Sequence, residues 1–120
     1  MKNLTVIIQP VKFDNLKKRL IDIGIHGMTV TNVEGYGIPK RAIKTAKPEE
    51  LAVELLPKLK IEMVLKDAEL QQAIDAVIDV TRTGRIGDGK LFIYEVSEAM
   101  RIRTGERGGR RYLNTITNYE

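Results

Sequence analysis

The stretch Lys58–Leu65 reads KLKIEMVL, and its apolar side chains alternate with mostly polar ones. A period of two is typical of a β-strand with one buried face, so this run predicts a strand. The residues that follow it carry apolar side chains at helical spacing, and we expect Asp67 to cap that helix. The core side of the strand is predicted to be Leu59, Ile61, Met63 and Leu65. The helical stripe is Leu70, Ala73, Ile74, Val77, Ile78 and Thr81.

The first part of the chain repeats this order of elements. Leu4–Gln9 is rich in β-branched residues and predicts a first strand. Asp14 or Asn15 can cap a following helix, for which Gly24 is a natural stop. Met28–Glu34 alternates and is again rich in β-branched residues, so it predicts a second strand.

A long connection joins the second strand to the strand at Lys58–Leu65. We place this loop at residues 37–55; it is weakly patterned and basic. Within it, Pro48–Glu50 suits the start of a short helix, because proline and acidic residues favour a helix N-terminus. Connections of this length inside a small domain tend to be functional or disordered.

Leu91–Val96, apolar on both faces, predicts the last strand. Ser97–Arg103 is expected to form either a short helix or an irregular segment. The order is strand, helix, strand, long loop, strand, helix, strand. This predicts an α+β fold, a ferredoxin-like βαββαβ sandwich over residues 1–105, followed by a basic tail over residues 106–120.

Both helices of such a fold pack on one face of the sheet. The other face then needs cover, because the strands carry too many apolar residues for one side, and we infer a homo-oligomer that buries it. The residues that cannot all turn to the helices are Ile7, Val64 and Phe92 or Ile93.

Composition narrows the function classes. The 120 residues have a net charge of +4, no cysteine and a single histidine, His26, so we expect no disulfide and no metal site. No nucleophile is paired with a general base, which argues against an enzyme.

No run is long and apolar enough to span a bilayer and no signal peptide is evident, so we expect a cytoplasmic protein. Stacking aromatics are scarce, Phe92 and Tyr94 are expected in the core, and we expect no nucleic-acid partner.

The candidate site is Thr83–Lys90, which reads TGRIGDGK and holds three glycines. Glycines open the backbone N–H groups to a ligand, and Lys90 adds a cation at the end of the loop. Arg101 and Arg103 follow, and these residue types suit a polyphosphate. The loop leads from a helix into a strand, so it is not a Walker A loop. The alternative is a glycine-rich surface turn with solvated cations.

These residues resemble the PII signal-transduction proteins, trimeric nitrogen regulators of bacteria, archaea and plastids. The resemblance runs from the first strand to about Gly105. It is carried by GMTVT at 27–31, GYG at 35–37, LPKLKIE at 56–62, TGRIGDGK at 83–90 and RIRTGE at 101–106.

The resemblance implies a homotrimer that binds ATP or ADP, with AMP also a candidate, in clefts between neighbouring subunits. Arg101 and Arg103 would come from the next subunit, and Lys58 is a candidate effector contact. The loop at 37–55 would dock on an ammonium-transporter-like membrane protein, recruiting the chain to the membrane, or on a metabolic enzyme. The implied nucleotide-binding residues are Thr29, Gly35, Gly37, Glu62, Val64, Gly87, Asp88, Gly89, Lys90, Arg101 and Arg103.

The departures from the family pattern fall in the long loop. Position 39 is commonly glutamine and helps ATP and a divalent cation bind 2-oxoglutarate, but here it is Pro39, which has no amide oxygen. Ile38 replaces a frequent arginine, and Leu51 replaces a tyrosine that is nucleotidylated in many members. We therefore expect no nucleotidylation and weak or absent magnesium-dependent binding of 2-oxoglutarate. The alternative function is a PII-like regulator of a non-nitrogen process that senses ADP or AMP against ATP.

Overall fold

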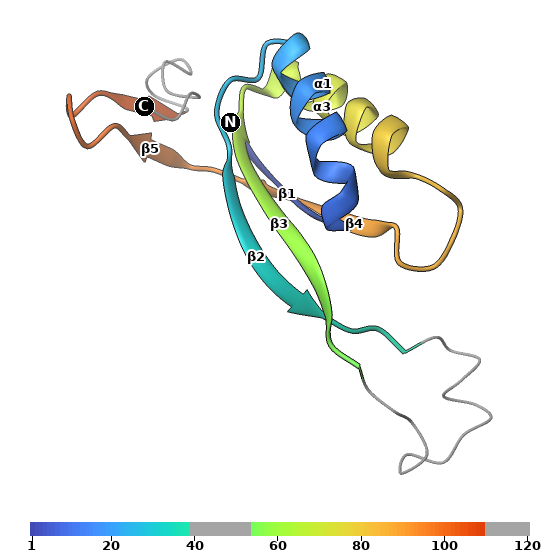
Figure 1. The fold of residues 1–120 in the computed structure, drawn as a ribbon. Helices are drawn as coiled ribbons and strands as arrows, with labels where there is room; N and C mark the ends of the chain where they lie inside the picture. Colours follow the sequence, from blue (N-terminus) through green and yellow to red (C-terminus); the bar gives the residue numbers. More distant parts are fainter. Residues whose placement is uncertain (39–53, 110–120) are drawn as a thin grey trace.

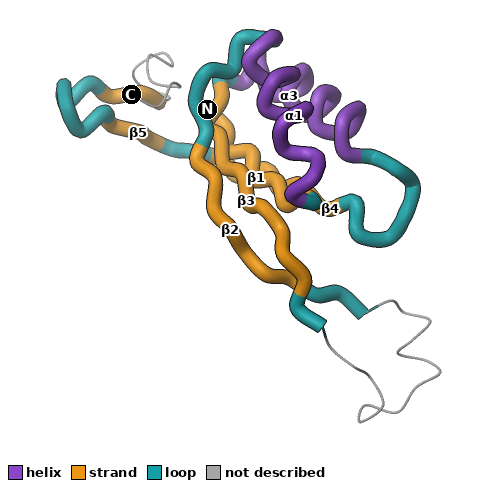
Figure 2. Tube along the Cα trace, in the orientation of Figure 1, coloured by secondary structure: helices purple, strands orange, loops and turns teal. Residues whose placement is uncertain are grey.

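Two helices lie on one face of an antiparallel sheet in the computed structural model, which describes residues 1–38 and 54–109 (Figures 1 and 2). The sheet has four strands in the order β2-β3-β1-β4, and a separate two-stranded sheet pairs β5 with β6. This confirms the α+β, ferredoxin-like fold. The elements are β1 (Lys2–Ile8), η1 (Pro10–Lys12), α1 (Phe13–Asp22), β2 (Thr29–Gly35), β3 (Leu56–Leu65), α3 (Asp67–Thr81), β4 (Gly89–Glu95), β5 (Glu98–Met100) and β6 (Arg107–Gly109).

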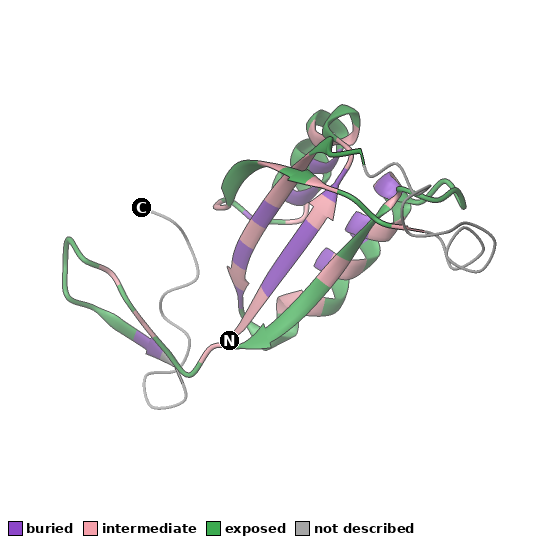
Figure 3. Cartoon of the chain, turned by 90° about the horizontal axis from the view of Figure 1, so that it is seen from below, coloured by how far each residue is buried: buried purple, intermediate pink, exposed green. Residues whose placement is uncertain are grey.

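The core lies between the helices and the covered face of the sheet. Alternate residues of β1 and β3 are buried there, which confirms the period-two prediction for β3 (Figure 3). The helices contribute an apolar stripe each. Of the residues predicted for α3, Ala73, Val77 and Thr81 are buried and Leu70, Ile74 and Ile78 are partly buried, while Ala76 is buried in addition. The buried core side chains of the strands are Leu4, Val6, Ile8, Ile61, Met63 and Leu65, and those of the helices include Leu16, Leu20, Ala73, Ala76 and Val77.

The other face of the sheet, which we call the open face, has no helix over it within residues 1–38 and 54–109 (Figure 2). Strand pairing places Ile7, Val64 and Phe92 on this face, because each alternates with a neighbour that packs toward the helices. Ile93 pairs with buried Leu4 and therefore turns to the helix side. The prediction that Phe92 and Tyr94 belong to the core is wrong for this chain, since they are 42% and 55% exposed.

Both predicted helix caps are wrong. A turn of 3-10 helix, η1, leads directly into α1, so Asp14 lies in the first turn of α1 rather than before it, with Lys12 at the N-cap. The N-cap of α3 is Lys66, whose backbone N–H donates to the Glu69 carboxylate at 3.0 Å. The predicted stop at Gly24 is confirmed by its φ of +94° just past the end of α1.

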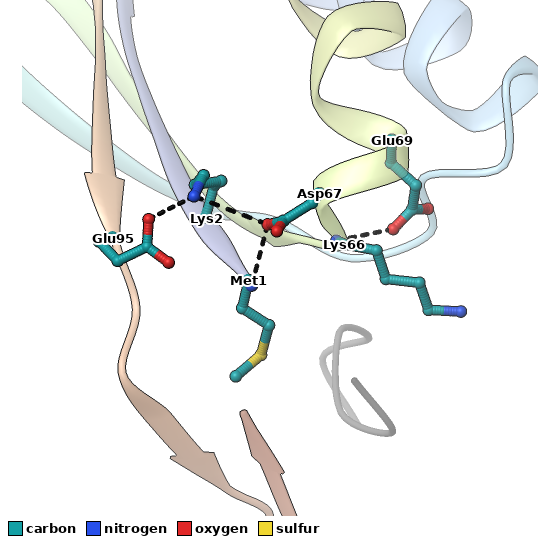
Figure 4. Close-up of polar contacts among 6 residues, drawn as sticks. All are labelled: Met1, Lys2, Lys66, Asp67, Glu69 and Glu95. Carbon is teal, nitrogen blue, oxygen red and sulfur yellow. Dashed lines mark hydrogen bonds and ion pairs between the residues drawn. The ribbon is translucent and has the colours of Figure 1, made fainter. Parts of the chain in front are cut away.

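Asp67 is instead the acidic partner of the chain start (Figure 4). Its carboxylate lies 3.0 Å from the ammonium group of Met1 and 3.8 Å from Lys2 Nζ. The hydrogen bond from the Met1 ammonium is the main reason that the pKa of Asp67 is lowered. Lys2 also pairs with Glu95 of β4, so these contacts join β1, α3 and β4 at one end of the sheet.

The segment after β4 is a β-hairpin. The prediction of a short helix or an irregular segment at Ser97–Arg103 is therefore wrong. β5 pairs with β6, and the turn between them is closed by Arg101 N–H to Glu106 O at 2.8 Å and Gly105 N–H to Arg101 O at 2.7 Å. A strand as short as β5 forms only because it has a partner downstream, which local sequence does not reveal. The expected boundary between domain and tail, at residues 105 and 106, falls inside this hairpin.

The long loop leaves the sheet at the end opposite to the hairpin (Figure 1). Gly35 pairs with Leu56 at its base. The predicted helix at Pro48–Glu50 and the departures at Pro39 and Leu51 lie outside the described residues. In the part of the chain that is described, no helix has the length and apolar character needed to cross a bilayer.

Replacing Leu16 tests the core. Leu16→Ala removes a fully buried side chain from α1, and we expect it to lower the free energy of unfolding by about 2–5 kcal/mol. The matched control is Ile21→Ala on the exposed side of the same helix, where we expect less than about 1 kcal/mol. Urea unfolding at one protein concentration measures both changes, and equal losses in the two variants would contradict the placement of the core.

Candidate phosphate site at the glycine loop

The glycine loop, residues 83–89, connects α3 to β4 at the end of the sheet from which the long loop also leaves (Figure 1). Gly84, Gly87 and Gly89 have φ values of +85°, +102° and +119°, a region that other residues rarely adopt. At Gly89 space is also decisive, because a Cβ atom there would lie 2.0 Å from the carbonyl oxygen of Ile7. The close approach of β4 to β1 therefore requires glycine at this position.

Asp88 closes the glycine loop. Its carboxylate accepts hydrogen bonds from the backbone N–H groups of Thr83 at 2.7 Å and Gly84 at 2.9 Å, and from the Thr83 hydroxyl at 2.5 Å. The same hydroxyl oxygen accepts the Arg85 N–H at 3.2 Å. Sequence analysis placed Asp88 among the nucleotide contacts; the structure shows that its carboxylate holds the loop itself in shape.

These contacts make Asp88 a stable anion. The Thr83 hydroxyl is the main cause of its lowered pKa, the backbone N–H groups of Thr83 and Gly84 add to the effect, and the charge of Lys12 contributes. Desolvation acts in the opposite direction and is outweighed. Because three donors and a nearby cation compensate the carboxylate, it repels an anion beside the loop less than a free carboxylate does.

Two side chains hold the carbonyl group of Gly87. Gln9 Nε2 donates to this oxygen at 3.1 Å, and Lys58 Nζ donates at 3.3 Å. Lys58 also lies beside Gly35, where an added Cβ atom would be 3.8 Å from Lys58 Cγ. One ammonium group thus connects the glycine loop with the base of the long loop. Gln9 was not among the predicted site residues; the only sign of it in the sequence was its place at the end of the first strand.

Two further lysines lie on the open face at the same end of the sheet. Lys60 of β3 and Lys90 of β4 are both paired with Ile7 of β1, one on each side. Since paired residues of an antiparallel sheet share a face, Lys60 and Lys90 flank Ile7 on the open face. Lys58, two residues before Lys60, faces the same way. Three cations and a glycine-rich backbone therefore gather at one end of the open face.

Three other predicted residues continue along the open face, away from the glycine loop. Thr29 is paired with Glu62 across β2 and β3, and Val64 follows two residues later on β3. Glu62 lies 3.5 Å from Lys60 Nζ. The face therefore passes from cationic to mixed polar and apolar, which suits a ligand with an anionic end and a flat, less polar end.

A hollow of about 260 Å³ lies between α3 and the edge of β4. Its walls include the apolar side chains of Val6, Ile8, Val77 and Leu91. Val6 and Ile8 turn to the helices, so this hollow reaches the covered side of the sheet. Asp88, Gly89 and Lys90 also line it, so it borders the glycine loop at the edge of β4.

The hairpin of β5 and β6, whose turn carries the two predicted arginines, lies far from the glycine loop within one chain (Figure 1). β4 begins at Gly89, and its seven residues span roughly 20 Å before the hairpin starts. Arg101 is held in that hairpin by Glu106, with Nη1 to Oε2 at 3.1 Å, and Arg103 lies in its turn. A single chain therefore brings Lys58, Gly87, Gly89 and Lys90 together but not Arg101 or Arg103.

Replacing Gly89 tests the close approach of β4 to β1. We expect Gly89→Ala to lower the melting temperature far more than Gly84→Ala. Both variants carry the left-handed backbone cost of about 1–2 kcal/mol, but an added Cβ atom at Gly84 meets nothing within 4 Å. Equal melting temperatures would contradict the contact with Ile7.

The Thr83 hydroxyl supplies a test of the Asp88 clamp. Thr83→Val keeps the shape of the side chain and removes the donor, so the pKa of Asp88 should rise toward its ordinary value of 3.8. Folding lowers this pKa, so the carboxylate stabilises the native chain above the unfolded pKa, and this contribution is lost as pH falls through the folded-state pKa. Carboxyl NMR titration measures the change, with Thr31→Val as control; an unmoved pKa in Thr83→Val would refute the clamp.

Comparison with known proteins agrees with the motifs. Residues 1–106 match the family model described as Nitrogen regulatory protein P-II. The chain is 49% identical over 109 residues to the nitrogen regulatory protein P-II of Rhodospirillum rubrum, which covers 91% of this chain and 97% of that protein. It is 46% identical over 109 residues to the protein of that name from Azospirillum brasilense, again 91% and 97% of the two chains. Over 106 residues, 88% and 95% of the two chains, it is 43% identical to nitrogen regulatory protein P-II 1 of Escherichia coli strain K12.

Proposed function

We propose, since the chain belongs to the nitrogen regulatory protein P-II family, that it is a signal-transduction protein that binds adenine nucleotides between the subunits of a homotrimer. Family membership supports a regulatory role in nitrogen metabolism, exerted on other proteins rather than through catalysis. In our proposal ATP and ADP compete for the site, and the loop at residues 37–55 carries the response to a target.

One observation carries the shared site: the glycine loop and the arginine hairpin lie at opposite ends of strand β4 in one chain (Figure 1). Arg101 and Arg103 have the chemistry to hold a phosphate, yet β4 separates them from Lys90 by roughly 20 Å. A second copy that presents its hairpin to the open face removes this separation. The phosphate site then takes its amides and lysines from one subunit and its guanidinium groups from the next.

The residues present fit a nucleotide. Polyphosphate needs backbone N–H donors and cations, and the glycine loop with Lys58, Lys60 and Lys90 supplies both at one end of the open face. Adenine and ribose need a less polar surface with a few polar groups, which Val64, Thr29 and Glu62 offer farther along.

The open face also supports the homotrimer. Ile7, Val64, Phe92 and Tyr94 lie on a sheet face that the helices of this chain do not cover. A soluble chain seldom leaves such a face in water, and a second copy can bury it while adding its hairpin to the site. Association and ligand binding then involve the same surface.

The target is proposed to be an ammonium-transporter-like membrane protein or a metabolic enzyme, engaged by the loop at 37–55. The first part of its sequence is cationic, with Lys40, Arg41, Lys44 and Lys47, which favours an acidic docking surface. One feature favours the second candidate function, a regulator of a non-nitrogen process: Ile38 and Pro39 offer no polar side chain at the loop base. Calorimetry with ATP, magnesium and 2-oxoglutarate tests this second candidate: we expect weak or absent binding of 2-oxoglutarate, and a micromolar dissociation constant would favour the nitrogen role.

Mixing two defective chains tests the shared site. We expect Lys90→Gln and Arg103→Gln each to weaken ATP binding about tenfold or more, because each removes a charged hydrogen bond. A trimer that contains both kinds of chain regains one intact interface of its three, so about a third of the wild-type sites should return. Differently tagged chains are co-expressed, mixed oligomers are isolated by both tags, and ATP stoichiometry is measured by calorimetry.

A site contained within one chain gives a different result. Each chain of the mixed oligomer then keeps its own defect, and no high-affinity sites return. A monomeric wild-type chain, or one whose melting temperature does not change with millimolar adenine nucleotide, would contradict the proposed function itself.

A further inference from the structure

The hairpin turn exposes one large apolar side chain that the proposed function does not use. Ile102, between the two arginines, is 98% exposed, more than any other large apolar residue that is described. An isoleucine at the tip of a turn gains nothing from water, and a turn of this kind is normally polar. Ile102 is therefore a candidate contact for another surface.

The turn that carries Ile102 is preorganised. Arg101 and Glu106 are joined by a backbone hydrogen bond of 2.8 Å and by an ion pair between their side chains at 3.1 Å. Thr104 Oγ1 accepts a hydrogen bond from the Glu106 N–H at 3.2 Å. Below the turn, Arg107 Nη1 lies 3.0 Å from Glu98 Oε1 across the two strands. The side chain of Ile102 is thus held on a defined tip, which lowers the entropy cost of binding through it.

The open face supplies an apolar position of the right kind beside the phosphate end. Ile7 lies between Lys60 and Lys90, and Phe92, 42% exposed, is two residues after Lys90 on the same face. Arg103 must come close to Lys90 to contact the same phosphate group. Its neighbour Ile102, whose Cα lies about 3.8 Å from that of Arg103, would then be within reach of Ile7 and Phe92.

We propose that Ile102 of one copy docks on Ile7 and Phe92 of the next, and that this apolar contact positions Arg103 for the nucleotide phosphates. Ile102 is a positioning residue in this arrangement, because it acts through Arg103. The inference rests on the proposed function, since it requires the shared nucleotide site. The occupant of this part of the open face is a second copy of the chain, and the contact couples subunit association to ligand affinity.

The test replaces Ile102 by serine in the full chain. Ile102→Ser should weaken ATP binding about tenfold, because the contact that orients Arg103 is lost. The matched control is Val11→Ser in η1, an apolar residue that is 78% exposed and lies outside the hairpin and the open face; it should change affinity less than about twofold. Circular dichroism and melting of each variant check that folding is unchanged.

A double-mutant cycle gives a readout that a merely structural role does not reproduce. In an Ile7→Ser background, Ile102→Ser should have little further effect on ATP affinity, because its partner is already absent. Full additivity of the two changes, or wild-type affinity in Ile102→Ser, would overturn the contact. The same comparison is made in an Arg103→Gln background, where Ile102→Ser should again have little further effect on ATP affinity.

Failure of this inference is distinguishable from failure of the proposed function. If the wild-type chain is oligomeric but binds no adenine nucleotide, the proposed function fails. The contact of Ile102 is then tested separately, by measuring dissociation of the oligomer with analytical ultracentrifugation. Ile102→Ser must then raise the concentration at which the oligomer dissociates; unchanged dissociation overturns the inference. If the wild-type chain is monomeric, both fail.

Discussion

The arrangement of the site depends on one backbone contact, between Gly89 of β4 and the carbonyl group of Ile7 in β1. An added Cβ atom at Gly89 would lie 2.0 Å from that oxygen, so glycine alone lets β4 pair there with the central strand. This pairing ends beside the glycine loop, where Gln9 and Lys58 both reach the Gly87 carbonyl. Strand pairing therefore brings three distant segments of sequence together, since β1 binds β3 on one edge and β4 on the other.

The sheet uses its two faces differently, and the period of two is the reason. On one face β1 and β3 turn apolar residues to the helices; on the other, lysines flank Ile7 at one end and Phe92 and Tyr94 follow. In the proposed trimer the face that binds nucleotide is also the face that binds the next subunit. Ligand binding and association are then thermodynamically linked, and a ligand that prefers the assembled state stabilises it.

Sequence patterns were sufficient for the order of the elements, because each strand or helix has its own hydrophobic period. They failed where a distant partner decides the outcome. Asp67 does not cap α3: it is the first residue of the helix, Lys66 is the N-cap, and the Asp67 carboxylate pairs with the Met1 ammonium group. β5 exists only through pairing with β6, and the positions of Phe92 and Tyr94 depend on which face the helices cover.

In the candidate site, too, the features set by local sequence were predicted and those set by distant contacts were not. The TGRIGDGK segment indicated the phosphate loop from sequence, because glycine spacing is a local property. The clamp by Asp88 and the bond from Gln9 to Gly87 were not predicted, since both depend on how the loop folds back. The separation of the arginines from the loop was implied only by family resemblance until the length of β4 gave it a physical basis.

Lys58 connects the proposed phosphate site with the base of the long loop. Its ammonium group donates to the neutral Gly87 carbonyl at 3.3 Å, while its backbone lies two residues from Leu56, where β3 begins. The ammonium donor is charged in both cases, but only a phosphate acceptor adds an opposite charge, and hydrogen bonds between two charged groups are the stronger ones. A phosphate within reach therefore competes successfully for Lys58. The glycine loop and the base of the long loop share this one cation, so a ligand that takes it changes the contacts of both.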